Sequence, residues 1–112
     1  MASEDFKFFR RDKSKWVEGD HVFDLLLDSD VELPFKLTAL REMKDISITV
    51  DVDIPYSVAL VDDLDGIHTF TVEDTYDISH ISRRKSKFLV LKLSPPKTGN
   101  YKGAFRFDYK VQ

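Results

Sequence analysis

Histidine is the residue type in this 112-residue chain best suited to acid–base or metal chemistry, and it occurs at positions 21, 68 and 80. Gaps of 47 and 12 residues leave no pair of histidines one helical turn apart, the spacing of a metal site on a single helix. The three could still converge with nearby carboxylates, so a small hydrolase or metal-dependent enzyme built on His21, His68 and His80 stays one hypothesis. Cysteine is absent, which excludes thiol catalysis and cysteine-ligated metals.

A run of carboxylates, Asp62-Asp63-Leu64-Asp65-Gly66, supplies the oxygen ligands that a hard cation such as Ca²⁺ prefers. The run lacks the alternating acids and the closing glutamate of an EF-hand loop, and Asp-Gly is a signal for a tight hairpin turn. The chain has no phosphate-binding glycine loop, no dinucleotide fingerprint and no Gly-x-Ser-x-Gly elbow. We therefore predict a protein that is not an enzyme and uses no metal or other cofactor.

Charge is segregated along the chain. Residues 45–82 contain nine acidic residues and no Lys or Arg, whereas residues 83–112 contain nine basic residues and one acid, Asp108. Opposite charges that face each other across antiparallel strands would account for this pattern within one molecule. The alternative is a charged contact surface, most simply between copies of the same protein.

The basic run is the candidate interaction surface, formed by Arg83, Arg84, Lys85 and Lys87. Such a run, with Phe88 beside it, could also contact the phosphates and bases of a nucleic acid. The isoelectric point of about 5.5 and the lack of an RNA-binding aromatic motif argue against that partner. We expect protein partners or self-association instead.

Alternation of apolar and polar residues dominates the chain and predicts β-strands. The clearest cases are Ile46–Ile54 and Ala104–Val111; in the second, Phe105 and Phe107 should face the core and Arg106 the solvent. The run Phe88–Leu93 is apolar almost throughout, which predicts a central strand. Further strands are expected at Phe6–Arg10, His21–Leu27, Phe35–Ala39, Ser57–Val61 and Ile67–Glu73.

Turns are predicted at Gly19-Asp20, at Asp65-Gly66 and over Lys97–Asn100, which follows Pro95-Pro96. Helix is expected at most in one or two short segments, Thr38–Lys44, with Leu40 and Met43 as its apolar positions, and Thr75–Arg84. Seven or eight strands with short turns predict an all-β fold, an antiparallel two-sheet β-sandwich, with a small barrel as the rival.

Length and composition set the limits of this prediction. A chain of 112 residues with 42% hydrophobic and 33% charged residues fits one globular domain over residues 1–112. Apolar runs such as Val58–Val61 are only four residues long, against the ~20 needed to span a bilayer. We therefore expect no membrane insertion.

The layout of three segments resembles the small, cysteine-free β-sandwich modules of tailed bacteriophages, which occur in tail, baseplate and accessory structural proteins. These segments are Trp16-Val17-Glu18-Gly19-Asp20, the alternating Ile46–Ile54 and the closing Gly99–Phe107. The resemblance implies a viral structural protein that docks onto other subunits, in a virion or in the host cytoplasm. It transfers no residue of known function.

The leading hypothesis is therefore a structural or interaction module that binds copies of itself or other proteins through sheet edges and charged loops. Carbohydrate binding is the alternative within the binding class, because exposed aromatic rings stack on sugars. Its candidate residues are Trp16, Tyr56, Tyr76 and Tyr101. Trp16 with Phe6, Phe8 and Phe9 could equally fill the core of a sandwich.

Overall fold

The computed structural model describes residues 4–19 and 21–112. Within these residues the chain forms nine strands and no helix. In chain order they are β1 (Phe6–Asp12), β2 (Lys15–Glu18), β3 (Val22–Leu27), β4 (Val31–Ala39), β5 (Met43–Val52), β6 (Tyr56–Val61), β7 (Tyr76–Ile81), β8 (Ser86–Leu93) and β9 (Gly99–Val111). No helix able to cross a membrane occurs in this part of the chain.

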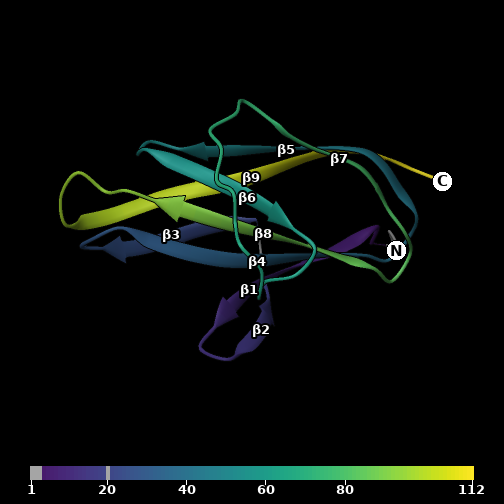
Figure 1. Ribbon diagram of the computed structural model, residues 1–112, viewed down its shortest axis with the longest axis horizontal. Helices are drawn as coiled ribbons and strands as arrows, with labels where there is room; N and C mark the ends of the chain where they lie inside the picture. Colours follow the sequence, from purple (N-terminus) through teal and green to yellow (C-terminus); the bar gives the residue numbers. More distant parts are fainter. Residues whose placement is uncertain (1–3, 20) are drawn as a thin grey trace.

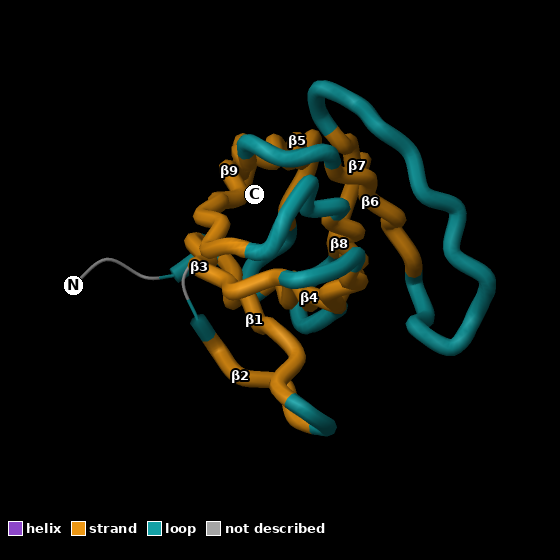
Figure 2. Tube along the Cα trace, turned by 90° about the vertical axis from the view of Figure 1, so that its left-hand side faces the viewer, coloured by secondary structure: helices purple, strands orange, loops and turns teal. Residues whose placement is uncertain are grey.

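The strands build two antiparallel sheets. One has five strands in the order β2-β1-β4-β8-β6, and the other has four in the order β3-β9-β5-β7. Figure 1 gives the course of the strands, and Figure 2 views the two layers nearly along the strands. The predicted all-β, two-sheet sandwich is confirmed, although the described residues contain nine strands where seven or eight were expected.

Alternation in β9 places its residues as predicted. Phe105 is buried in the core, Phe107 is half-buried on the same face, and Arg106 is exposed on the other face. Gly103 also faces inward, directly opposite Phe23 on β3. A Cβ at Gly103 would overlap the Phe23 ring, so glycine is required here for the close approach of strand and ring.

The prediction of a central strand at Phe88–Leu93 is also confirmed, because β8 lies between β4 and β6. Its alternate residues Leu89, Leu91 and Leu93 belong to the main core. β8 ends at Leu93, before Pro95, as expected from a residue that cannot donate to a sheet.

The helix candidate Thr38–Lys44 is not helical, which remains within the expected limit of at most one or two short helices. Residues up to Ala39 belong to β4, residues from Met43 belong to β5, and a short turn joins them. The two apolar positions of the expected helix are separated, because Leu40 lies in this turn and Met43 begins β5. A β-bulge follows in β5: two residues, Asp45 and Ile46, lie between the register positions Lys44 and Ser47 where β9 has one. The extra residue, Asp45 with φ of 50°, lets Met43 and Ile46 both face the core although they are three apart.

The weaker helix candidate, Thr75–Arg84, is not helical either. It contains β7, which pairs with the bulged part of β5 and continues into an exposed turn. Ile78 and Ile81 are both buried at a spacing of three, while Ser79 and His80 between them are exposed. A spacing of three apolar residues is typical of a helix, and here it follows the irregularity of the sheet.

The predicted strand Ile67–Glu73 is replaced by a loop over residues 62–75, in which Thr71 makes an isolated bridge to Val58. Asp65-Gly66 lies in a turn of this loop and does not close a hairpin of two strands. The strands that the sequence did not predict are β2 and β7. The turn expected at Gly19-Asp20 includes Asp20, which lies outside the described residues.

Candidate interaction surfaces

The four basic residues of the candidate interaction surface belong to a turn and to the strand that follows it. Arg83, Arg84 and Lys85 are exposed in the turn between β7 and β8. Backbone hydrogen bonds hold this turn to the end of β4: the Arg84 amide donates to the Ala39 carbonyl at 2.7 Å, and the Ala39 amide donates to the Lys85 carbonyl at 3.0 Å. Lys87 lies within β8 and forms an ion pair with Asp62.

Two ion pairs join the acidic and basic segments within one molecule. Lys87 pairs with Asp62, and Lys110 on β9 lies 3.4 Å from the carboxylate of Asp45 on β5. Part of the charge segregation is therefore internal complementarity between neighbouring strands. Many of the other charged residues form no ion pair within the described part of the chain, and nine of them lie in the two segments described next.

The first is the loop of residues 62–75 between β6 and β7, hereafter the acidic loop. Two backbone hydrogen bonds of 2.9 Å tie Thr71 to Val58 on the edge strand β6. The hydroxyl of Tyr76 donates to the Thr71 carbonyl at 2.7 Å and accepts from the Glu73 amide at 3.1 Å, while the hydroxyl of Tyr56 donates to the Glu73 carbonyl at 3.1 Å. Burial of the phenol raises the pKa of Tyr76.

The outward side of the acidic loop combines negative charge with exposed apolar residues. Ile67 is 97% exposed and Val72 is 70% exposed. The loop has five acids and no Lys or Arg, a net charge of −5. Loops of this length are uncommon in compact domains and are usually functional when they occur. The sequence pattern identified the acids of this loop, but it predicted a strand around Thr71.

The second segment is the hairpin of β1 and β2, hereafter the basic hairpin. Residues 10–15 contain four basic residues and Asp12, a net charge of +3. Asp12 on β1 is the register partner of Lys15 on β2, so Lys13 and Ser14 make a two-residue turn. Lys13 takes the positive φ of 58° that such tight turns require. Figures 1 and 2 show this hairpin projecting from the body of the sandwich.

Beside the basic hairpin, the outer face of the five-stranded sheet carries a cluster of aromatic and cationic side chains. The Arg11 guanidinium lies 5.0 Å from the Trp16 ring centroid, and the Lys36 ammonium lies 4.5 Å from Phe9 and 5.2 Å from Trp16. The rings of Trp16 and Phe88 are 5.8 Å apart. We call these five residues the aromatic–cation cluster. Trp16 therefore lies outside the core with Phe9, whereas Phe8 belongs to the core.

The third surface is the edge strand β3. Among the described residues β3 pairs with β9 alone, so its other edge has no strand beside it. Leu26 is 75% exposed and Val22 is 67% exposed on its outward face. Between β3 and the strands β1 and β4 opens a hollow of about 240 Å³, and its apolar lining comes from Phe23, Leu25, Leu33, Pro34 and Phe35.

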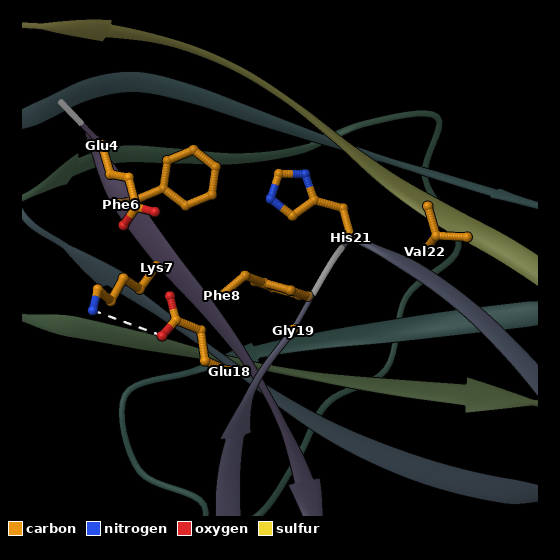
Figure 3. A pocket seen from close by; sticks show the side chains of 8 residues that line it. All are labelled: Glu4, Phe6, Lys7, Phe8, Glu18, Gly19, His21 and Val22. Carbon is orange, nitrogen blue, oxygen red and sulfur yellow. Dashed lines mark ion pairs between the residues drawn. The ribbon is translucent and has the colours of Figure 1, made fainter. Parts of the chain in front are cut away.

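His21 lies at a larger pocket of about 610 Å³ near the starts of β1 and β3 (Figure 3). Its imidazole stacks on the Phe6 ring at 5.4 Å and meets Phe107 edge-on at 4.8 Å. Lys7 and Glu18, whose charged groups lie 3.7 Å apart, also line the pocket. The described lining residues include carboxylates and an imidazole but no hydroxyl or thiol nucleophile.

The other two histidines have different neighbours. A ring nitrogen of His68 lies 3.0 Å from the Leu64 carbonyl within the acidic loop, and His80 on β7 pairs with Glu42. Within residues 4–19 and 21–112, no group of three His, Asp or Glu side chains could hold a metal ion. The described structure therefore does not bring His21, His68 and His80 into one site.

The aromatic residues considered for carbohydrate binding are also dispersed. Tyr56 and Tyr76 both hold the acidic loop through their hydroxyls, and Tyr76 is buried. Tyr101 on β9 donates to the Lys97 carbonyl at 2.7 Å. Trp16 is the member of this set whose ring lies in the aromatic–cation cluster.

Comparisons with protein-family models, with curated proteins and with solved structures found no match for this chain. Its function is therefore inferred from the surfaces described above.

Proposed function

We propose that this protein is a non-enzymatic structural module that acts through contacts with other protein chains. The observation that carries the proposal is β3, an edge strand of six residues with Val22 and Leu26 exposed on its outward face. Edge strands of monomeric proteins are usually protected by Lys, Pro or a bulge, because an open edge pairs with other chains. β3 contains none of these, and Asp24 is its one charged residue.

We propose that a partner binds by adding a strand to the sheet beside β3. A partner segment that pairs with the open edge of β3 would satisfy the free backbone groups on that edge. Alternate side chains of the partner would then point toward Val22 and Leu26 on one face and toward the hollow beside Leu25 on the other. Each face also carries charge, because Asp24 lies between Val22 and Leu26, and Arg10, Arg11 and Asp12 also line the hollow. Both faces nevertheless expose apolar side chains, so pairing would remove apolar surface from water and stabilise the complex.

More specifically, we propose that the protein is an accessory protein of a virion or of a phage tail apparatus. This form depends on the resemblance of its segment layout to the sandwich modules of tailed bacteriophages. Proteins of that kind work by docking onto neighbouring subunits, which an open strand edge would allow.

Site-specific cross-linking tests the proposal. A photoreactive amino acid placed at Leu26 should give cross-linked species of discrete mass in the cells that naturally make the protein. The matched control carries the same group at Arg106, an exposed position on the central strand β9 of the same sheet. Equal cross-linking at both positions, or none at Leu26, would overturn the proposal.

Carbohydrate binding is a second candidate function, favoured by the aromatic–cation cluster. Trp16 has Phe88 at 5.8 Å on a sheet face, an arrangement on which a sugar ring could stack. Trp16 is the single tryptophan of the chain, so its fluorescence reports on this site alone. A saturable change in Trp16 fluorescence on titration with glycans, and a binding heat that calorimetry detects for the unmodified protein but not for Trp16→Leu, would support this function. The absence of binding heat with every glycan would reject it.

A further inference from the structure

We propose that copies of this protein dock head to tail, with the basic hairpin and aromatic–cation cluster of one copy against the acidic loop of the next. This inference rests on the proposed function and names the partner, a second copy of the chain. It uses surfaces distinct from β3. The two inferences can therefore fail separately.

Charge complementarity is the first argument. The basic hairpin carries a net charge of +3 over residues 10–15, and the acidic loop carries −5 over residues 62–75. Within the described residues no ion pair engages Arg10, Lys13 or Lys15, and none engages Asp65, Glu73 or Asp74. The two segments thus hold charges of opposite sign that are not neutralised within one copy.

The apolar residues match in the same way. Ile67 and Val72 project from the acidic loop with little cover from their own chain. The aromatic–cation cluster offers three rings, those of Phe9, Trp16 and Phe88, with the cations of Arg11 and Lys36 beside them. An apolar centre surrounded by paired charges is the usual composition of a specific protein interface.

The sheet order supplies the geometry. β2 and β6 are the two edges of the five-stranded sheet, so the basic hairpin and the acidic loop lie at opposite ends of one sheet. Figure 2 shows them projecting in different directions from the sandwich. A contact between two different surfaces of identical copies is heterologous, and it generates a ring or an open filament.

The acidic loop is also held in place before it binds. Its backbone is tied to β6 at Thr71 and to the hydroxyls of Tyr56 and Tyr76, and its Phe70 ring lies 5.6 Å from the Lys92 ammonium. A surface that is ordered in advance loses less conformational entropy on binding.

The turn that contains Arg83, Arg84 and Lys85 is the competing basic surface. It lies between β7 and β8, next to the end of β4, and the pocket beside it is lined by Leu40, Arg41, Glu42 and Gln112. Within the part of the chain that the structure describes, no cation–π contact involves its three basic side chains, so they do not form an aromatic–cation cluster of the kind that could receive Ile67 and Val72. This difference favours the basic hairpin as the docking surface.

A charge exchange tests the contact. One variant carries Arg10→Glu, Lys13→Glu and Lys15→Glu, and a second carries Asp65→Lys, Glu73→Lys and Asp74→Lys. We expect sedimentation velocity in low salt to show assemblies for the unmodified protein and monomers for each variant alone, since each variant then has like charges on both surfaces. Mixing the two variants should restore assembly, because the reversed charges are again complementary.

Salt and a matched variant complete the test. Assembly should weaken by about tenfold or more between roughly 0.01 M and roughly 1 M salt, as the Debye length falls from ~30 Å to ~3 Å. The matched control reverses Arg83, Arg84 and Lys85 to Glu and should assemble like the unmodified protein. Circular dichroism should show the same β-sheet spectrum for all variants.

Each outcome decides the inference. Recovery of assembly in the mixture supports it. A monomer at every salt concentration, a loss of assembly in the control variant alone, or a mixture that stays monomeric would overturn it. If the protein is monomeric but still cross-links to another protein through Leu26, the head-to-tail contact is rejected while the proposed function stands; if it does neither, both are rejected.

Discussion

The outer faces of the two sheets differ, although the same two-residue alternation produces both. On the four-stranded sheet the outward residues of the central strands are mostly polar, among them Thr49 on β5 and Arg106 and Asp108 on β9. On the five-stranded sheet the outward residues include Phe9, Trp16 and Phe88. The centre of the four-stranded sheet is therefore adapted to water, although its edge strand β3 exposes Val22 and Leu26. The outer face of the five-stranded sheet instead has the aromatic composition of a contact surface.

Some outward side chains of the five-stranded sheet are also buried. Val90 is 2% exposed and Ala59 is 1% exposed, yet neither belongs to the core between the sheets. They are register partners on β8 and β6, and they alternate with the inward residues Leu91 and Val58. The Lys92 ammonium, next outward along β8, lies over the Phe70 ring, so the acidic loop packs against this outer face. The five-stranded sheet therefore has side chains buried on both sides.

The largest expected effect tests the inner face against the outer face of the four-stranded sheet. Phe105→Ala should lower the free energy of unfolding by about 3–5 kcal/mol, because it removes a buried ring from the core. Arg106→Ala, its exposed neighbour, should change it by no more than about 0.5 kcal/mol. Urea denaturation measures both. Similar losses at the two positions would show that the register of β9 is wrong.

A matched pair of near-isosteric changes compares the two outer faces. Val90→Thr should cost about 1–3 kcal/mol, because the new hydroxyl is buried under the acidic loop. Thr49→Val on the polar face of the other sheet should change stability by at most about 0.5 kcal/mol. The comparison fails if Val90→Thr is as well tolerated as Thr49→Val in the same thermal or urea unfolding assay.

The attachment of the acidic loop is tested by Tyr76→Phe. Loss of the hydroxyl removes its hydrogen bonds to Thr71 and Glu73 and should cost about 1–2 kcal/mol. Amide exchange at Thr71 and Glu73 should speed up. Tyr101→Phe, whose hydroxyl bonds the Lys97 carbonyl elsewhere, serves as the control and should leave exchange in the loop unchanged.

Alkaline pH gives an independent measure of the same attachment. Burial raises the pKa of Tyr76 above its ordinary value of 10.0, so the folded state holds this proton more tightly than the unfolded state. The corresponding stability is fully present below pH 10 and is lost as the pH rises through the raised pKa. Tyr76→Phe should therefore show a smaller loss of stability above pH 10, and an identical pH profile would contradict this account.

The smallest expected effect concerns the ion pair between Lys87 and Asp62. Asp62→Asn should cost less than about 1 kcal/mol, because the carboxylate is largely exposed, and the cost should shrink as salt is added. Asp63→Asn is the neighbouring control for loss of charge alone. A salt-independent loss would mean that Asp62 acts through packing of the acidic loop.

Local pattern was sufficient to locate much of the fold. Strict alternation in Ile46–Ile54 and Ala104–Val111 identified β5 and β9 because one face of each strand packs on the core, although β5 ends at Val52. The pattern failed where the sheet departs from regularity. At the bulge beside Asp45, apolar residues fall three apart, as on a helix, and in the acidic loop Thr71 forms a bridge without a strand.

The candidate surfaces were less accessible to such reasoning. Arg83–Lys85 stood out as a run of charge, yet a run of charge does not show whether each residue has a partner within the fold. Lys87 forms an ion pair with Asp62, which lies 25 residues away in the sequence. The sequence pattern did not predict a basic surface at the hairpin, because Asp12 and Ser14 interrupt its basic residues.

By itself, the amino-acid sequence determined the all-β class, the inward and outward sides of the long strands and the separation of acidic from basic segments, because each depends on neighbours within a few residues. The tertiary structure decided which strands are edges and which side chains meet across the sheet. Phe9 and Trp16 are close in sequence, but Lys36 and Phe88 join them through the pairing of β1, β4 and β8. Such contacts depend on strand order, which hydrophobic burial across the whole core selects.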